Sequence, residues 1–319
     1  MTVFLIRRTL YGIVVLWAIS VATFALFFVA PHDPARIIAG RLATPQTVAL
    51  VRHRLGLDEP VLTQYWHFVD RLLHGNLGYS FYSSTQVNSL LLTRLPVTVS
   101  LALGAAVIWL SGGVLVGVLS AARPGSFVDR AATVVVLTGL STPTFLLGIL
   151  LIYFFFYRLH LVGIDFFPAG GYVPLTQSPA GWAQHLILPW ITLAFVSAAV
   201  YSRLTRSSLL DTMSQDYIRT ARAKGLSERR VIFRHGLRAS LTPIVTIFGL
   251  DIALLVGGAI ITESVFNIQG LGWLAITSAE SQDLPSVLGV VLCTATAVAI
   301  MNLVVDIVYA FLDPRVRYA

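Results

Sequence analysis

The chain reads Asp216-Tyr-Ile-Arg-Thr-Ala-Arg-Ala-Lys-Gly-Leu-Ser-Glu-Arg-Arg-Val-Ile-Phe-Arg-His-Gly-Leu-Arg238 between two long apolar runs, and this stretch decides the fold. Its seven lysines and arginines cannot lie in hydrocarbon, so the stretch must protrude from a membrane protein. Gly225 is predicted to end a first amphipathic helix. The apolar face of that helix recurs at three- and four-residue spacing, at Leu210, Met213, Tyr217 and Ala221.

A second helix is predicted after the glycine. Ser227 is suited to accept a backbone N–H as the N-cap, and Glu228 suits the first turn because the helix dipole favours negative charge there. Arg229 is placed on the solvated face. We therefore expect a helix, a glycine turn and a helix, presented to the aqueous phase as a docking surface. The second apolar face is carried toward Pro243 by Val231, Ile232 and Leu237.

The stretch resembles the cytoplasmic EAA loop of ABC importer permeases, in the form used by the dipeptide and oligopeptide branch. The general pattern, Glu-Ala-Ala, three residues, then Gly, falls on Arg219, Thr220, Ala221 and Gly225, and two of the four positions match. His32 stands where the family usually has Gly before Asp-Pro. Similar motifs extend over the whole chain. They are Arg7-Arg8, Asp33-Pro34-Ala35, His74-Gly-Asn-Leu-Gly78, Ser141-Thr-Pro-Thr-Phe145, Leu204-Thr-Arg-Ser207, Gly257-Gly258 through Thr262-Glu263, and Asp313-Pro-Arg315.

Composition also indicates a membrane protein. Apolar residues make up 56% of the chain and charged residues 12%, with a mean hydropathy of +0.79. These values are far from those of soluble domains. The single cysteine, Cys293, has no partner for an intrachain disulfide. The net charge of +7 is interpreted as cytoplasmic loops of a membrane protein, and no nucleic acid is expected as a partner.

Six apolar runs are long enough to cross about 30 Å of hydrocarbon, which takes roughly 20 residues. A cleaved signal peptide is the alternative for the first run, but that run is too long for an h-region and no small-x-small site ends it. The predicted spans are Arg8–Val29, Val97–Leu119, Val128–Tyr157, Leu186–Ser202, Leu241–Val265 and Ser286–Leu312.

The distribution of basic residues predicts the orientation. With the N-terminus inside, fifteen of the twenty-two lysines and arginines lie on the cytoplasmic side, so the positive-inside rule places both termini in the cytoplasm. The predicted domains are a first transmembrane helix (1–30), an extracytoplasmic helical cap (31–94), a permease core (95–312) with a cytoplasmic coupling loop (203–240), and a cytoplasmic tail (313–319).

The cap is punctuated by Pro45 and Pro60, which flank an apolar-patterned stretch through Val48, Val51 and Leu55. Its aromatic residues have two interpretations. They line a substrate entrance, or they anchor the cap at the membrane interface and pack its underside, which is the commoner role at that depth. These residues are Tyr65, Trp66 and Phe68.

Several chemistries find no support in the sequence. Lys224 is the only lysine and follows Ala-Arg-Ala, so there is no phosphate-binding P-loop. The seven histidines form no metal-ligating motif, and no metal site is predicted. Ser111, in Leu110-Ser-Gly-Gly113, resembles the nucleophile segment of a rhomboid-like protease, but the leading glycine is missing and no histidine lies mid-membrane to activate it. No catalytic residue is expected, and small residues here are interpreted as helix-packing contacts.

Three acidic residues, Asp251, Glu263 and Asp306, lie within or near apolar runs. Intramembrane carboxylates are costly and are candidates for function, which raises a proton-coupled secondary carrier as the rival class. Asp251 lies well within a span, whereas Glu263 and Asp306 lie near ends where water or an arginine is within reach. A carrier would usually show more spans and an internal repeat, and neither is evident.

The resemblance implies an all-α polytopic membrane protein with six transmembrane helices, the type I ABC importer permease fold, in the bacterial plasma (inner) membrane. It implies half of the pathway of an ATP-driven peptide importer, with nickel chelates or other small solutes as alternative substrates. The implied partners are a homologous second permease, two cytoplasmic ATPases, an extracytoplasmic peptide-binding lipoprotein and membrane lipid. The chain itself binds no cofactor, and ATP and Mg are used by the partner subunits. The expected coupling residues are Asp216, Tyr217, Arg219, Thr220, Ala221, Ala223, Lys224, Gly225 and Leu226, and the expected pathway or gating residues are Pro143, Pro243, Asp251, Gly257, Gly258 and Glu263.

Overall fold

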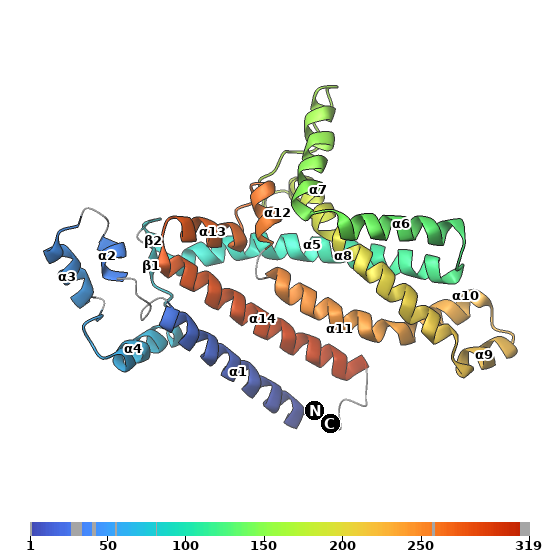
Figure 1. Ribbon diagram of the computed structural model, residues 1–319, viewed down its shortest axis with the longest axis horizontal. Coiled ribbons are helices and arrows are strands. Elements are labelled where there is room, and N and C mark those ends of the chain that lie inside the picture. Colours follow the sequence, from blue (N-terminus) through green and yellow to red (C-terminus); the bar gives the residue numbers. More distant parts are fainter. Residues whose placement is uncertain are drawn as a thin grey trace.

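The computed structural model describes residues 2–26, 34–39, 43–54, 56–80, 82–256 and 259–312, and it is an elongated helical bundle (Figure 1). Within these described ranges, four helices are long and apolar enough to cross a membrane, and a bent helix pair makes a fifth candidate span. The four are α1 (Thr2–Phe24), α5 (Val87–Ala122), α8 (Pro179–Met213) and α14 (Leu284–Leu312).

Helices α5 and α8 form the centre of the bundle. Their contact buries Trp109 and Tyr201 completely, and the two rings lie 6.3 Å apart. Gly113 of α5 allows the close approach, since a Cβ there would lie 2.7 Å from the Cβ of Tyr201 and 2.9 Å from the carbonyl oxygen of Ala198. Gly113 and Gly117 are therefore packing contacts, as expected for small residues between membrane helices, whereas a Cβ placed at Gly112 would meet no other atom within 4 Å.

Helix α5 begins ten residues before the predicted span, at Val87, and continues through Pro96. The boundary predicted between residues 94 and 95 thus falls inside a continuous helix. Val87 and Leu91 are buried against the C-terminal part of the chain, and this packing stabilises the part of the helix that precedes the proline. With 36 residues, α5 is longer than the membrane is thick.

The third predicted span, Val128–Tyr157, is not one straight helix. It consists of α6 (Phe127–Ser141), α7 (Thr144–Leu151) and the π-helix η2 (Ile152–Arg158), and the two halves are bent by 105°. Pro143 is the N-cap of α7, and Thr142 before it is extended, as the residue before a proline prefers. The second half leaves the bundle as an arm (Figure 1). No side chain of η2 is buried.

The fifth predicted span, Leu241–Val265, is also divided. Helix α11 (Leu237–Val256) contains Pro243 without breaking, and a separate short helix, α12 (Ile260–Val265), follows. Gly257 and Gly258, predicted as gating residues, lie outside the described residues. Helix α13 (Leu271–Glu280) then leads into α14.

The cap is helical, as predicted. It contains α2 (Pro34–Ala39), α3 (Pro45–Arg54) and α4 (Val61–Leu73), with Pro45 as the first residue of α3 and Pro60 directly before α4. Leu55 lies outside the described residues. A small antiparallel ladder between β1 (Tyr79–Ser80) and β2 (Thr85–Gln86) was not expected.

The cap and the basic loop lie at opposite ends of the bundle (Figure 1). Helices α1 and α14 run antiparallel beside each other, and the beginning of α1 and the end of α14 both point away from the cap. Arg8 and Asp306 form an ion pair between these two helices, with Nη2 of the arginine 2.8 Å from Oδ1 of the aspartate.

Candidate functional site

The basic loop folds as a helix, a glycine turn and a second helix. Helix α9 (Asp216–Ala223) is followed by Gly225 and then by α10 (Glu228–Arg230), which continues through the π-helix η3 (Val231–Gly236) into α11. Gly225 has a φ of +75°, and no atom lies within 4 Å of the position of a Cβ there. The predicted glycine turn is confirmed, and the residue is required for its backbone conformation because space is open around it.

A small apolar cluster holds α9 against η3. Ile218 and Val231 are fully buried, Ala221 is buried beside them, and Met213 and Leu226 close the cluster. The opposite face of α9 is exposed. Of the expected coupling residues, those on the exposed side are Asp216, Tyr217, Arg219, Thr220, Ala223, Lys224 and Gly225.

The predicted apolar face of the first helix is wrong in its details. Helix α8 ends at Met213 and α9 begins at Asp216, so the four predicted positions are divided between two helices. The change of direction turns Tyr217 outward, with 48% of it exposed, and puts Ile218 in the buried position. The exposed aromatic ring is thus available to a partner.

Ser227 is the N-cap of α10, as predicted, but its side chain makes no capping hydrogen bond. Its carbonyl oxygen instead accepts from the backbone N–H of Arg230 and Val231, at 2.8 and 3.0 Å. Glu228 lies in the first turn and pairs with Arg222 across the glycine turn, at 3.1 Å from Nε and 2.7 Å from Nη2. This pair ties α9 to α10.

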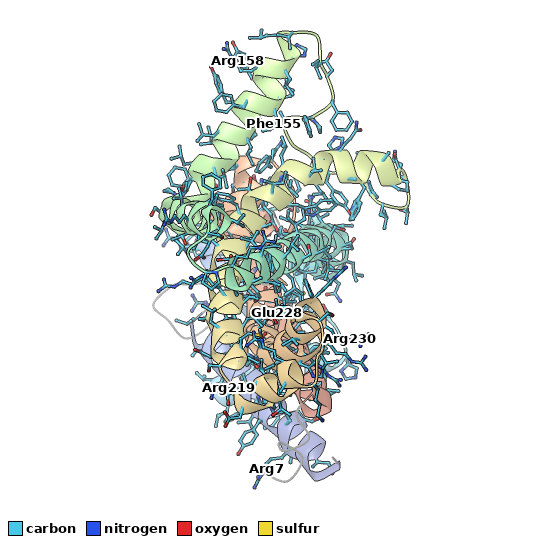
Figure 2. All side chains as sticks on the ribbon, turned by 90° about the vertical axis from the view of Figure 1, so that its right-hand side faces the viewer. Arg7, Phe155, Arg158, Arg219, Glu228 and Arg230 are labelled. Carbon is cyan, nitrogen blue, oxygen red and sulfur yellow. The ribbon has the colours of Figure 1, made fainter. Side chains whose placement is uncertain are left out.

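The hydrogen bonds from Arg222 lower the pKa of the Glu228 carboxyl. The stability gained is therefore present above the ordinary carboxyl pKa and is lost as the pH falls through the lowered value. Both side chains are about half exposed, so the contribution is small. Arg219, Glu228 and Arg230 lie together at this end of the bundle, whereas Phe155 and Arg158 lie on the distant arm (Figure 2).

Asp251, in the middle of α11, accepts a hydrogen bond from the hydroxyl of Tyr201 on α8, at 2.7 Å. Asp251 is only partly buried, while Tyr201 is fully buried between α5 and α8. The carboxylate is thus held by a neutral donor and keeps part of its surface accessible. Asp251 therefore stays a candidate for the translocation pathway, because its carboxylate is partly accessible within a membrane-spanning helix.

Glu263 and Asp306 have structural partners. Glu263 is completely buried and accepts from the Thr98 hydroxyl at 2.7 Å and from the backbone N–H of Trp273 at 2.8 Å, in the first turn of α13. Thr98 in turn accepts from the N–H of Leu271. Glu263 therefore contacts the N-terminus of α13, and its hydrogen-bond partners among the described residues include no arginine. The arginine expected for Asp306 is Arg8.

The three cap aromatics differ in their surroundings. Phe68 is buried and lies 5.7 Å from the ring of Phe24 on α1, and Tyr65 stacks edge-on against the same ring. The Tyr65 hydroxyl also lies 3.0 Å from Oγ of Ser20. Both residues pack the underside of the cap onto α1. Only Trp66 is largely exposed and accessible as an entrance residue.

Ser111 does not have the surroundings of a nucleophile. Its hydroxyl donates to the carbonyl oxygen of Val107 in its own helix. Within the part of the chain that the structure describes, no three histidine, cysteine or acidic side chains converge to hold a metal ion.

The comparison with protein families is decisive. The model of the binding-protein-dependent transport system inner membrane component matches residues 113–318, and the model of the N-terminal part of such components matches residues 1–102. The chain belongs to this family.

The permease is also similar over its full length to individual relatives. It is 39% identical to a probable peptide ABC transporter permease protein of Sinorhizobium fredii and 40% identical to a putative peptide transport system permease protein of Brucella abortus, with 100% of both chains covered in each comparison. It is 39% identical to the glutathione transport system permease protein of Escherichia coli, with 99% of each chain covered.

Solved structures support the fold of the permease. Inward-facing structures of the MetNI methionine ABC transporter match with a TM-score of 0.52 and 21% identity, covering 70% of this chain and 96% of theirs. At this identity the match shows the fold alone. The permease has the type I ABC importer fold, and the expected all-α membrane architecture is confirmed.

Family membership establishes the class of function. The permease is a multi-pass inner membrane component of an ABC importer, a class that works with ATPase and binding-protein partners. It is a transporter subunit without an ATPase site of its own.

Proposed function

We propose that the permease forms half of the translocation pathway of a peptide importer and that its ATPase partner docks on the exposed face of α9. The observation that carries this proposal is the loop itself. Helix α9 presents Tyr217, Thr220 and Lys224 outward at the end of the bundle while Ile218 is fully buried beneath them. An apolar side chain anchored beneath a polar, exposed face is suited to transmit force from a bound partner.

The loop joins the two helices that hold the pathway candidate. Helix α8 leads into α9, and η3 leads into α11, which carries Pro243 and Asp251. The buried contact between Ile218 and Val231 makes α9 follow η3. In the proposed mechanism of alternating access, ATP binding draws the ATPases together, α9 moves as a rigid lever, and α8 and α11 rearrange around the substrate. The spans that contain Pro143, Pro243 and the sequence pair Gly257-Gly258 are the ones proposed to rearrange.

The full complex is proposed to contain a homologous second permease, two cytoplasmic ATPases that use ATP and Mg, and an extracytoplasmic peptide-binding lipoprotein. The cap faces the lipoprotein, and Trp66 is its exposed aromatic residue. Both termini are proposed to lie in the cytoplasm with the basic loop. The positive-inside rule supports this proposal, and so does the direction of α1 and α14 away from the cap (Figure 1). Membrane lipid and the second permease cover the exposed apolar side chains of the outer helices.

A peptide is proposed as the substrate because relatives aligned over the full length bear the names of peptide and glutathione permeases. Nickel chelates or other small solutes remain the alternative within the family. No cofactor is assigned to this chain.

The energy source is tested by uptake in a reconstituted complex. Uptake is expected to require ATP on the loop side and to survive collapse of the proton gradient, since the ATPase partners supply the free energy. Asp251 is the residue that favours the rival proton-coupled carrier, because its carboxylate is partly accessible within α11. The proposal fails if an uncoupler stops wild-type uptake while ATP stays high and if, in a separate preparation without uncoupler, Asp251→Asn abolishes uptake.

A further inference from the structure

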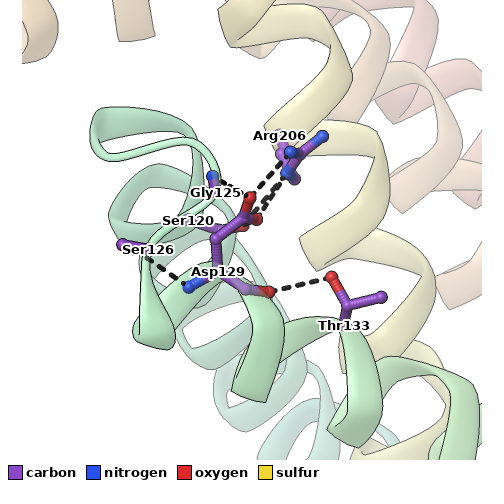
Figure 3. Close-up of polar contacts among 6 residues, drawn as sticks. All are labelled: Ser120, Gly125, Ser126, Asp129, Thr133 and Arg206. Carbon is purple, nitrogen blue, oxygen red and sulfur yellow. Dashed lines mark hydrogen bonds and ion pairs between the residues drawn. The ribbon is translucent and has the colours of Figure 1, made fainter.

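An ion pair between a buried carboxylate and a partly exposed arginine joins α6 to α8, with the end of α5 beside it (Figure 3). Asp129 of α6 is 5% exposed. Its Oδ1 accepts from Nε of Arg206 at 2.8 Å and its Oδ2 accepts from Nη2 of the same arginine at 2.9 Å. Two parallel hydrogen bonds of this kind fix the orientation of the partners as well as their distance.

Further donors complete the site around the Asp129 carboxylate. The Ser120 hydroxyl, near the end of α5, donates to Oδ1, and the backbone N–H of Gly125 donates to Oδ2 at 2.8 Å. Arg206 Nε also lies 3.1 Å from the Ser120 hydroxyl oxygen. The carboxylate thus binds the end of α5, the connecting turn and α8 at one point. We call these three side chains, Ser120, Asp129 and Arg206, the α5–α6–α8 clasp.

The position of the clasp gives it significance for coupling. Arg206 lies two turns before the end of α8 at Met213, and α9 follows directly. Next to the clasp in the sequence of α5 and α8, apolar packing of Val118, Leu209 and Ile232 joins α5, α8 and η3. Among the described residues, no side-chain hydrogen bonds join α8 to α6 other than those of Arg206 to Asp129.

A charged pair has a different mechanical property from apolar packing. Apolar packing has no preferred hydrogen-bond geometry, whereas the paired hydrogen bonds fix the orientation of both partners, and separating the buried carboxylate from its arginine leaves an uncompensated charge. The clasp therefore resists relative movement of α6 and α8 more strongly than the apolar contacts beside it.

We propose that the α5–α6–α8 clasp makes the α5–α6 hairpin move as one body with α8, so that a displacement of α9 also reaches the bend at Pro143. This proposal rests on the proposed function, because it assigns Asp129 and Arg206 as positioning residues for ATP-driven transport. The movement passes from α9 to α8, through Arg206 to Asp129, and along α6 to its end at Ser141. The arm of α7 and η2 begins there.

The test measures uptake and ATP turnover together in the reconstituted complex with loaded binding protein. Arg206→Lys keeps the charge but loses the two parallel hydrogen bonds, and Asp129→Asn keeps the shape but loses the charge. Each variant is expected to assemble and to hydrolyse ATP at close to the wild-type rate, while uptake per ATP falls about tenfold, within the range of allosteric coupling. The double variant is expected to lose no more than the worse single variant, because the two residues act as a unit.

Arg203→Ala is the matched control, since Arg203 lies one turn earlier on α8 and is exposed. It is expected to leave uptake per ATP unchanged. Membrane-embedded amount and thermal unfolding are recorded for each variant, and Arg206→Lys carries the test if Asp129→Asn is not inserted.

Two results would overturn the clasp proposal. Unchanged uptake per ATP in Arg206→Lys is one, and a fall of uptake and ATP turnover in equal proportion, following the amount of folded protein, is the other. The wild-type measurement distinguishes failure of the clasp proposal from failure of the proposed function. If wild-type uptake does not depend on ATP, the importer mechanism is rejected, and the clasp proposal with it.

Discussion

Valine at Gly225 is expected to leave a membrane-inserted permease that no longer transmits the binding-protein signal to its ATPases. Gly225 has a φ of +75°, which costs a non-glycine residue roughly 1–2 kcal/mol and is least tolerated by a β-branched one. The surrounding space is open, so the cost is one of backbone conformation and falls on the angle between α9 and α10. Binding-protein-stimulated ATP turnover should fall about tenfold or more, since a small misplacement of a coupling element has large kinetic effects.

Two control substitutions sharpen the Gly225 test. Asn at Gly225 tolerates a positive φ and should retain much of the stimulation. Arg229→Ala, on the exposed first turn of α10, should have little effect. Near-normal turnover in Gly225→Val, equal to that of Arg229→Ala, would show that the loop is not the coupling element.

Leucine at Gly113 is expected to prevent assembly of the bundle. A Cβ at this position would lie 2.7 Å from the Cβ of Tyr201 and 2.9 Å from the carbonyl oxygen of Ala198, so both the side chain and the backbone of α8 must move. Overpacking of a filled core costs roughly 1–3 kcal/mol, and a leucine against backbone belongs at the upper end or beyond. The measurement is the amount of monodisperse protein extracted from the membrane, together with its thermal unfolding temperature.

The neighbouring residue provides the control for Gly113. No atom lies within 4 Å of a Cβ placed at Gly112, so Gly112→Leu adds the same side chain to the same turn of α5 without meeting α8. It should be extracted in normal amount. Equal loss in both variants would mean that leucine disturbs insertion of α5, and that the α5–α8 contact is not the cause.

The sequence was sufficient to predict the apolar runs, the cap and the glycine turn, because each depends on local composition or on one backbone conformation. The ends of the helices were harder to predict. Pro143, Pro189 and Pro243 lie within predicted apolar runs and Pro96 directly precedes one, yet of these four only Pro143 lies at a break between helices. Around Pro96 the decisive factor is the burial of Val87 against a distant part of the chain, which no local pattern records.

The polar partners were the other limit of sequence reasoning. Asp129 and Arg206 are 77 positions apart, and Thr98 and Glu263 are 165 apart, so no spacing rule connects them. The carboxylates in apolar runs were a usable signal for Asp251, Glu263 and Asp306. Asp129 was missed because it lies near the end of its run beside Arg130, where a charged residue is unremarkable. The sequence pattern predicts Tyr217 on the buried face of the helix, but Ile218 is the buried residue. The turn between α8 and α9 changes the direction of the chain, so the spacing of apolar residues in α8 does not continue into α9.

The central claim, that an ATPase docks on the exposed face of α9, is tested most directly by site-specific photocrosslinking. A photoreactive residue at Tyr217, which is 48% exposed, should form an adduct with the ATPase subunit in the assembled complex. The same residue at Trp66, exposed in the cap at the opposite end of the bundle, should form none with the ATPase. Adducts of Tyr217 with lipid alone, or an ATPase adduct from Trp66, would contradict both the docking site and the orientation proposed for the permease.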